Sequence, residues 1–349
     1  MKILILEPYF TCSHAAWAKG YQRYSQYHIE ILCLSGQFLK WRMHGGAVTL
    51  VRMFRSQNFS PDLLMASDML DLTTFLALTR HRIAEFPVVI YFHENQLSYP
   101  WSPGDRDVIQ KRDRHYGFIN YSSALAADAV FFNSQFHQDS FLRELHRFLK
   151  QFPDHRELEN VDKIAAKSQV LHLGLDLKRF GQYRHSSGEK KGLPPLLLWN
   201  HRWEYDKNPQ DFFRALFVLS EQELDFRVAI LGENFSQAPV VFDKEREKLA
   251  TKNVQYGYVQ DFGQYADWLH RSDIIPVTSN QDFFGASVVA AVYCGCFPIL
   301  PKRLAYPEIF SLEFYPNNFY NNFDDLVEKL ANAVKKILNP YDNKIYQPL

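Results

Sequence analysis

The sequence predicts an α/β protein of two doubly wound domains, each a parallel sheet with helices on both faces. Short apolar runs rich in Val, Ile and Leu alternate with helical patterns along the chain, which is typical of buried parallel strands. Near the middle, residues 185–195 form a polar stretch with several Gly and Pro, which indicates a linker between domains. The length of 349 residues is sufficient for two cores of ordinary size.

The first half of the chain shows six runs of strand length separated by helical patterns. The expected strands are Ile3–Leu6, Glu30–Leu34, Leu63–Ala66, Val88–Phe92, Ala129–Phe132 and Val170–Leu173. The expected helices lie near His14–Gln26, Leu70–Arg80, Val108–Ala127 and Ser134–Gln151.

After the linker the same alternation begins again. The expected strands are Leu196–Trp199, Phe226–Leu231, Val254–Tyr258, Ile274–Val277 and Phe297–Leu300. A final helix is expected over Phe323–Leu338, with Asn322 and Asp325 at the spacing of a capping box. We therefore expect a first domain over residues 1–185 and a second over residues 186–322. A C-terminal helix and tail over residues 323–349 would be free to pack back on the first domain.

The composition excludes some classes of partner. With 39 basic and 39 acidic residues the net charge is zero, so the protein exerts no general attraction on nucleic acid or an anionic membrane. Contact with RNA would then depend on a local basic surface. Cys12, Cys33, Cys294 and Cys296 lack the spacing of a metal site, and we expect reduced thiols in a cytoplasmic protein. We expect neither a signal peptide nor a transmembrane segment, and hence no membrane partner.

The most informative segment is Asp282–Ser287, which follows an apolar strand and leads into a helix. An acid precedes a glycine turn, and Gly285, Ala286 and Ser287 are small residues at the start of the helix. A helix that begins at such a turn presents free N–H groups and the positive end of its dipole to a phosphate. The acid is able to accept hydrogen bonds from sugar hydroxyls. Together these features indicate a nucleotide-sugar site.

Two cations are expected close to this segment. Arg202 and Lys207 follow the strand Leu196–Trp199, at the carboxyl end where a doubly wound domain binds its ligand. Fixed cations at that place would neutralise a diphosphate leaving group. Solvated loop charges are the alternative interpretation, and the neighbouring glycine turn favours binding.

Polar residues also follow two strands of the first domain. The fourth expected strand ends in His93, Glu94 and Asn95, which we expect to face the ligand cleft. A single His is more often structural, but the place of His93 at a strand end favours a site residue. The first strand lacks a G-x-G-x-x-G sequence, which argues against a dinucleotide-dependent oxidoreductase. Ser13 and His14 follow the first strand, and one interpretation is that they line the acceptor side. The alternative is that Ser13 caps the next helix.

Two basic segments are candidates for contact with a nucleic acid. Lys40, Trp41 and Arg42 place an aromatic side chain between two cations, while residues 106–115 carry several cations diluted by acids. A solvated surface is the simpler interpretation of both segments.

Taken together, these segments resemble the GT-B glycosyltransferases of glycosyltransferase family 4, and within that family the tRNA-queuosine α-mannosyltransferase group. The matching segments are Leu6–Phe10 with Ser13, His14 and Trp17; Lys40–Met43; Phe92–Gln96; Phe132–Ser134; His172–Asp176; Asn200–Glu204 with Asp206 and Lys207; Phe283–Gly285; and Val292–Cys296 with Tyr306–Glu308. They span nearly the whole chain and occur in the order of the family.

The resemblance implies two Rossmann-like domains that face each other across a cleft. It also implies transfer of mannose from GDP-mannose, with retention, to the cyclopentenediol of queuosine in tRNA. Arg202 and Lys207 would hold the donor diphosphate, Asp282 would bind the sugar hydroxyls, and His93 would lie beside the transferred sugar. The remaining donor contacts implied are Phe284, Gly285, Ala286 and Ser287. The acceptor contacts expected are Ser13, His14, Trp41, Arg42, Glu94 and Asn95. Neither a metal nor another cofactor is implied, because the two cations stabilise the leaving group.

The chain departs from the family at one motif, which has two glutamates eight residues apart. Asp282 occupies the first position and Ala290 the second, whose glutamate contacts the nucleotide ribose in the family. Two alternatives are therefore kept. One is a GT-B enzyme with a lipid-linked or polysaccharide acceptor, which would use Phe38–Leu50 as a membrane-surface helix. The other is a catalytically weak protein that binds a nucleotide sugar or RNA.

Overall fold

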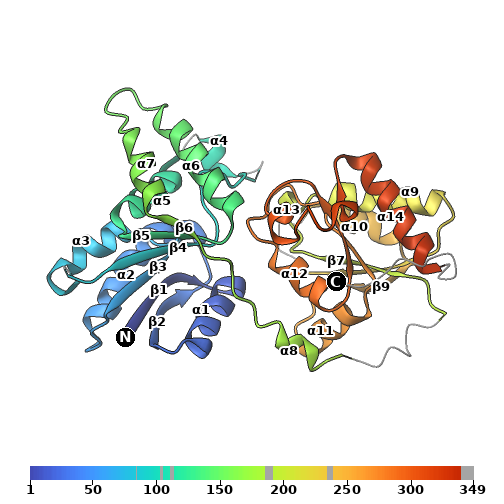
Figure 1. Ribbon diagram of the computed structural model, residues 1–349, viewed down its shortest axis with the longest axis horizontal. Helices are drawn as coiled ribbons and strands as arrows, with labels where there is room; N and C mark the ends of the chain where they lie inside the picture. The colour runs from blue at the N-terminus through green and yellow to red at the C-terminus, as the bar shows by residue number, and fades with distance from the viewer. Residues whose placement is uncertain (84, 103–104, 111–113, 185–191, 234–238, 339–349) are drawn as a thin grey trace. The chain divides into compact units, whose positions relative to one another are not determined.

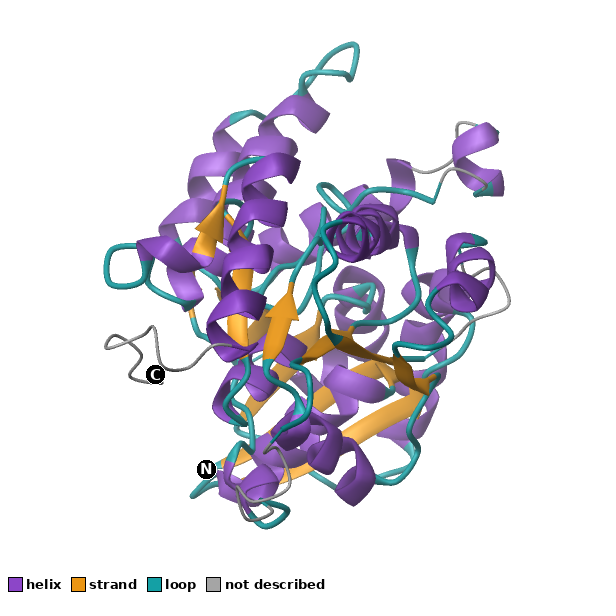
Figure 2. Cartoon of the chain, turned by 90° about the vertical axis from the view of Figure 1, so that its right-hand side faces the viewer, coloured by secondary structure: helices purple, strands orange, loops and turns teal. Residues whose placement is uncertain are grey.

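The protein consists of two α/β units, Met1–Leu175 and Asp176–Leu349 (Figure 1). The computed structural model describes residues 1–83, 85–102, 105–110, 114–184, 192–233 and 239–338. Each unit contains a six-stranded parallel sheet, and helices flank the strands (Figure 2). The predicted fold class of two doubly wound units is confirmed.

The first unit alternates strands and helices along the chain. Its elements are β1 (Lys2–Phe10), α1 (Cys12–Tyr24), β2 (His28–Ser35), α2 (Leu39–Arg55), β3 (Leu63–Ser67), α3 (Leu72–Ile83), β4 (Val88–Phe92), α4 (Arg106–Ile109), α5 (Arg114–Ala126), β5 (Ala129–Phe132), α6 (Gln135–Leu149), α7 (Glu159–Ala166) and β6 (Ser168–Val170). The strand order is β2-β1-β3-β4-β5-β6. Because the chain changes direction in the sheet at β1, the carboxyl ends of β1 and β3 mark a switch point, where doubly wound sheets bind ligands.

Both faces of this sheet are buried by helices. Successive side chains of a strand point to opposite faces. Leu4 and Leu6 accordingly join one apolar cluster with α2, α3, α5 and α6. Ile3 and Ile5 join a second cluster with Trp17 of α1.

The second unit repeats the design. Its elements are α8 (Lys178–Gly181), β7 (Leu196–Asn200), η2 (Tyr205–Lys207), α9 (Pro209–Glu221), β8 (Arg227–Leu231), α10 (Val241–Lys248), β9 (Asn253–Tyr256), α11 (Phe262–Arg271), β10 (Ile274–Pro276), α12 (Ala286–Tyr293), β11 (Phe297–Pro301), α13 (Tyr306–Ile309), η3 (Pro316–Asn318), β12 (Phe319–Tyr320) and α14 (Phe323–Leu338). The order β12-β11-β10-β7-β8-β9 places the switch point between the carboxyl ends of β7 and β10.

Some predicted elements differ in extent. The strand expected over Val170–Leu173 ends at its first residue, because the partner strand β5 itself ends at Phe132. The helix expected over Val108–Ala127 is divided into α4 and α5. The N-cap of α1 is Thr11, so the alternative role of Ser13 as a cap is wrong.

The domain boundary also lies earlier than expected, at residue 175 instead of 185. The α8 segment packs on the second unit, where the Arg179 guanidinium lies 3.6 Å from the centroid of the Phe262 ring. His270 Nε2 donates to the Phe180 carbonyl oxygen at 2.9 Å. Most of the predicted linker, residues 185–191, lies outside the described residues.

The C-terminal helix α14 belongs to the core of the second unit, whereas the sequence left it free to pack on the first. Leu326, Leu330 and Val334 lie in one apolar cluster with Trp199 of β7 and Phe212 of α9. The predicted cap is present, because Asn322 Oδ1 accepts a hydrogen bond from the Asp325 N–H at 3.0 Å. The tail over residues 339–349 lies outside the described residues.

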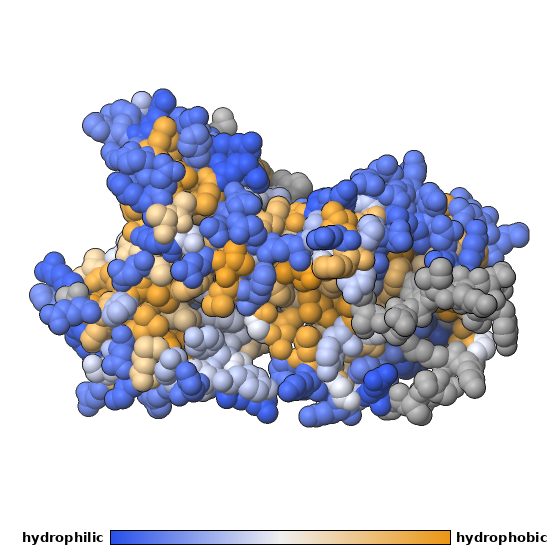
Figure 3. Space-filling model, viewed as in Figure 1, coloured by the Kyte–Doolittle hydropathy of each residue, from blue (hydrophilic) through white to orange (hydrophobic). Residues whose placement is uncertain are grey.

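The surface of the two units is mainly polar over the outer helices, with apolar residues visible nearer the sheets (Figure 3). Among the helices of the described residues, none has the combination of length and apolar character needed to cross a membrane. Cys33, Cys294 and Cys296 are free thiols, as expected.

Candidate active site

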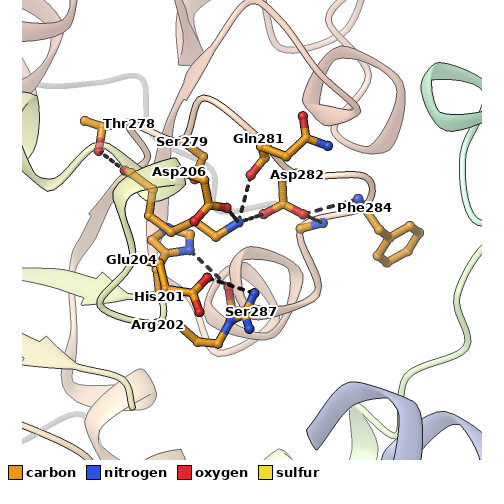
Figure 4. Close-up of polar contacts among 12 residues, drawn as sticks. His201, Arg202, Glu204, Asp206, Thr278, Ser279, Gln281, Asp282, Phe284 and Ser287 are labelled. Carbon is orange, nitrogen blue, oxygen red and sulfur yellow. Dashed lines mark hydrogen bonds and ion pairs between the residues drawn. The ribbon is translucent and has the colours of Figure 1, made fainter. Parts of the chain in front are cut away.

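The switch point of the second unit gathers the predicted donor residues (Figure 4). β7 ends at Asn200 and leads through Arg202 into η2, which ends at Lys207. The chain after β10 contains Asp282 and the turn into α12. Parallel strands that neighbour each other in a sheet end at the same edge, so two segments distant in sequence meet here.

Lys207 is buried at the centre of this group. Its Nζ donates to the Gln281 carbonyl oxygen at 2.7 Å and lies 3.2 Å from Asp206 Oδ2 and 3.5 Å from Asp282 Oδ2. Burial lowers the pKa of Lys207, but the carboxylates of Asp282 and Asp206 outweigh it and raise this pKa above its ordinary value. Lys207 is therefore a permanent cation that ties η2 to the loop after β10.

Asp282 holds the glycine turn in place. Its Oδ1 accepts the N–H of Gly285 at 2.8 Å and that of Phe284 at 3.3 Å, and Oδ2 accepts the Tyr306 hydroxyl at 3.1 Å. Burial raises the pKa of Asp282, but Lys207 and the hydrogen bonds hold it below its ordinary value. These contacts occupy most of the acceptor capacity of the carboxylate, so binding of sugar hydroxyls by Asp282 stays a prediction.

Gly285 is required by the shape of the turn. Its φ is +83°, and a Cβ at this position would lie 2.9 Å from Tyr306 Cε1. It is the N-cap of α12, whose first N–H groups, at Ala286 and Ser287, have no partner within a helix. The helix starts where the sequence predicted, and binding of a phosphate at its positive end stays a prediction. The buried ring of Phe284 points away from the Asp282 carboxylate (Figure 4).

Arg202 is the more accessible of the two predicted cations. Its side chain is 46% exposed and lies 3.1 Å from Glu204 Oε2. His201, beside it, is buried and its Nδ1 lies 3.4 Å from Ser287 Oγ. Burial and the charge of Lys207 lower the pKa of His201 to about 4, so this imidazole is neutral.

A second cluster lies at the switch point of the first unit. Glu7, in β1, is fully buried and its Oε2 lies 3.0 Å from His14 Nδ1. Its Oε1 accepts the N–H of Tyr9 at 2.8 Å. Burial alone would lower the pKa of His14, but the Glu7 carboxylate raises it to about 9. The pair is therefore a carboxylate and an imidazolium at neutral pH.

His93 packs directly on this pair. Its ring centroid lies 4.2 Å from that of His14, 4.7 Å from that of Trp17 and 4.9 Å from that of Tyr91. Burial and the charge of His14 lower the pKa of His93 well below its ordinary value. Its Nε2 is buried and has no hydrogen-bond partner among the described residues. His93 is thus a neutral imidazole with one unused polar atom.

Asp68 is a member of this cluster that sequence analysis missed. Its Oδ1 accepts the His93 N–H at 2.9 Å, and burial raises its pKa to about 8. Its place directly after β3 was the signal that would have found it, because β3 borders the switch point.

The other predicted acceptor residues differ in their burial and in their hydrogen-bond partners. Asn95 is buried, and its Oδ1 accepts the N–H groups of Leu97 and Ser98, so it shapes the loop after β4 instead of facing a ligand. Glu94 Oε1 accepts a hydrogen bond from Gln96 Nε2. Ser13 is exposed in the first turn of α1.

Trp41 and Arg42 lie on α2, and Trp41 is exposed. Of the second basic segment, residues 111–113 lie outside the described residues.

Glu7, His14 and His93 are the one group within the described residues that is close enough to hold a metal ion. Their ligand atoms lie within 4.8 Å of one another. A metal-bound His must be neutral, whereas the Glu7 carboxylate favours a proton on His14. The donor set therefore suits a charged hydrogen-bonded pair better than a metal.

Residues 2–175 match the family model described as tRNA-queuosine alpha-mannosyltransferase N-terminal. A Drosophila melanogaster protein named tRNA-queuosine alpha-mannosyltransferase is 36% identical over 343 residues, which cover 95% of this chain and 86% of that protein.

Two solved structures share the fold. Anabaena Alr3699/HepE in complex with UDP has a TM-score of 0.63 and 16% identity, and the match covers 97% of this chain and 91% of that one. A UDP-forming trehalose-phosphate synthase from Burkholderia xenovorans has a TM-score of 0.64 and 11% identity, covering 95% and 90%. At these identities they show the fold alone, and the predicted GT-B fold is confirmed.

The Glu7–His14 pair predicts a pH dependence of stability. The pKa of His14 is about 9 in the folded chain and 6.5 when unperturbed. The stabilisation that the pair gives to the folded state is therefore fully present below pH 6.5, and it is lost as the pH rises to about 9. We expect the free energy of unfolding to fall by up to about 3 kcal/mol over this window. Chemical denaturation at several pH values measures it.

Glu7→Gln should flatten this fall, because the neutral amide no longer holds the proton on His14. Glu30→Gln is the matched control, since Glu30 pairs with His28 at 3.4 Å on the exposed surface. Equal slopes for the wild type and Glu7→Gln would refute the assignment of the charged pair.

Proposed function

The chain belongs to the tRNA-queuosine α-mannosyltransferase family, and we propose that it transfers mannose from GDP-mannose, with retention, to the cyclopentenediol of queuosine in tRNA. The observation that carries the reaction class is the meeting of Arg202, Lys207 and the start of α12 at one switch point. A diphosphate is the ligand that two cations and free helix N–H groups suit best. The acceptor is proposed from the Drosophila relative, and GDP-mannose from the family resemblance.

The reaction requires charge stabilisation more than a protein base. The bond between the anomeric carbon and the diphosphate oxygen breaks, and the acceptor oxygen bonds to that carbon on the same face. The acceptor proton passes to the leaving phosphate oxygen. Arg202 and the α12 N–H groups would stabilise the negative charge that develops there, with Lys207 adding a fixed positive charge behind them. No metal is needed in this scheme.

His93 remains the predicted neighbour of the transferred sugar. A neutral imidazole both donates and accepts a hydrogen bond, which suits it to sugar hydroxyls. Ala290 is buried in an apolar cluster of the second unit, so that position contributes packing instead of a carboxylate for the ribose.

The alternative of a membrane-bound acceptor has less support. α2 buries Met43, Leu50 and Phe54 in the first unit, so its apolar face is already used by the core. A membrane-surface helix needs that face for the lipid. The cations and His93 likewise argue against a catalytically weak binding protein.

Transfer of radiolabel from GDP-mannose tests the proposal. Two purified tRNA preparations would be compared, one with queuosine at the wobble position and one with unmodified guanosine. Label on the first alone is expected, and it should persist in excess EDTA because no metal takes part. Label on neither tRNA, or a loss of label with EDTA that added Mg²⁺ restores, would contradict the proposal.

The donor site is tested best at Arg202. Removal of Lys207 would take a buried cation away from the carboxylates of Asp206 and Asp282 and would destabilise the unit. Arg202→Ala avoids this problem, because the side chain is half exposed. We expect kcat/KM for the donor to fall about 100-fold or more, with an unchanged unfolding midpoint.

Arg271→Ala is the matched control for Arg202→Ala. The Arg271 side chain is 40% exposed and pairs with Asp267 at 3.4 Å. Arg271 is the last residue of α11, which leads into the amino end of β10, whereas the glycine turn follows the carboxyl end of that strand. Similar kinetics for both variants would remove Arg202 from the donor site.

A further inference from the structure

Two large aromatic side chains stand exposed at the start of α2. Phe38 is 73% exposed and Trp41 is 62% exposed. A Cβ on Gly45 would lie 2.4 Å from Trp41 Cζ2, so the indole lies across this glycine, one turn further along the helix. The contact fixes the orientation of the indole, and the glycine makes room for it.

The backbone supports a use for Phe38 beyond packing. Its φ of +57° and ψ of +54° lie in the left-handed region, which a bulky side chain adopts only against a steric cost. Such strain persists where the surrounding structure enforces it, and it concentrates at functional sites. Here the strained residue presents its ring to solvent, so core packing does not explain the choice of Phe.

The cations on either side of Trp41 are already engaged within the protein. Lys40 Nζ lies 2.6 Å from Asp105 Oδ1 and 2.5 Å from Asp107 Oδ2. The Arg42 guanidinium donates to the Ser35 carbonyl oxygen and to Ser35 Oγ, each at 3.1 Å. These pairings leave the two exposed rings, and not the cations, as the groups best placed for the contact with a nucleic acid that was considered for this segment.

The start of α2 lies beside the cluster that contains His14. A Cβ on Gly36 would lie 2.3 Å from Thr11 Cβ, which shows how closely the chain after β2 approaches the loop after β1. Tyr9 and Leu39 both pack against one further apolar cluster of the first unit. The rings of Tyr9 and His14 lie 6.2 Å apart in an edge-on arrangement.

We propose that Phe38 and Trp41 form a base-stacking platform that binds an unpaired nucleotide next to the one that receives the sugar. This inference rests on the proposed function, which gives the protein an RNA acceptor. Single-stranded bases bind proteins by stacking on aromatic side chains, with little dependence on base identity. Since Asp105 and Asp107 compensate the nearby lysine, the platform favours the uncharged face of a base over the phosphate backbone.

The platform is tested by the affinity of the full chain for queuosine-containing tRNA, measured by fluorescence anisotropy at 50 and 200 mM salt. Trp41→Ala should weaken binding about tenfold at both salt concentrations, because loss of stacking does not change the number of phosphate contacts. Trp41→Phe should retain most of the affinity. Phe314→Ala is the matched control, since Phe314 is also 73% exposed but lies in the second unit.

Phe38→Gly separates the platform from a structural role. Glycine adopts the left-handed backbone without strain, so the unfolding midpoint should rise or stay constant while tRNA binding weakens. A purely structural Phe38 would give lower stability with lower affinity, or no change in affinity.

The outcomes also separate this proposal from the proposed function. Equal tRNA affinity for the wild type, Trp41→Ala and Phe38→Gly would overturn the platform, even if mannose transfer is observed. A wild type that binds tRNA through Trp41 without transferring mannose would keep the platform and overturn the proposed reaction. A wild type that does neither would overturn both.

Discussion

The buried ammonium of Lys207 is the constraint on which the geometry of the predicted donor site depends. Its contacts with Asp206, Gln281 and Asp282 join η2 to the loop after β10, so they fix the two strand ends that border the switch point. Asp282 in turn accepts the N–H of Gly285 and sets the start of α12. The pairing of the Lys207 ammonium with these two carboxylates thus determines the direction in which α12 presents its free N–H groups.

The first unit uses charge in a similar way. Glu7 and His14 form a buried charged pair that leaves His93, packed on it, as a neutral imidazole with an unused Nε2. In each unit a fixed ion pair holds the strand end, and a second polar group lies beside it: Arg202, which pairs with Glu204, in one unit and His93 in the other. A preorganised site of this kind loses little free energy to rearrangement when the substrate binds.

Sequence patterns predict the features that depend on local chemistry. The alternation of apolar runs gives the two sheets, and the glycine turn before Ala286 gives the start of α12. Sequence patterns do not predict which polar side chains pair with one another in the folded protein. Asn95 forms a turn within its loop, and Lys40 pairs with Asp105 and Asp107, more than sixty residues away. Such pairings follow from tertiary packing, which brings together segments with no common periodicity.

The energetic coupling between Lys207 and Asp282 tests most directly whether this buried ion pair holds the two strand ends together. A double-mutant cycle with Lys207→Met and Asp282→Asn would be followed by the free energy of unfolding of the full chain. Each single change breaks a buried pair, so we expect the double variant to lose less stability than the sum, with a coupling of about 1–3 kcal/mol. Additive losses would contradict the account, because the two residues would then hold the site independently.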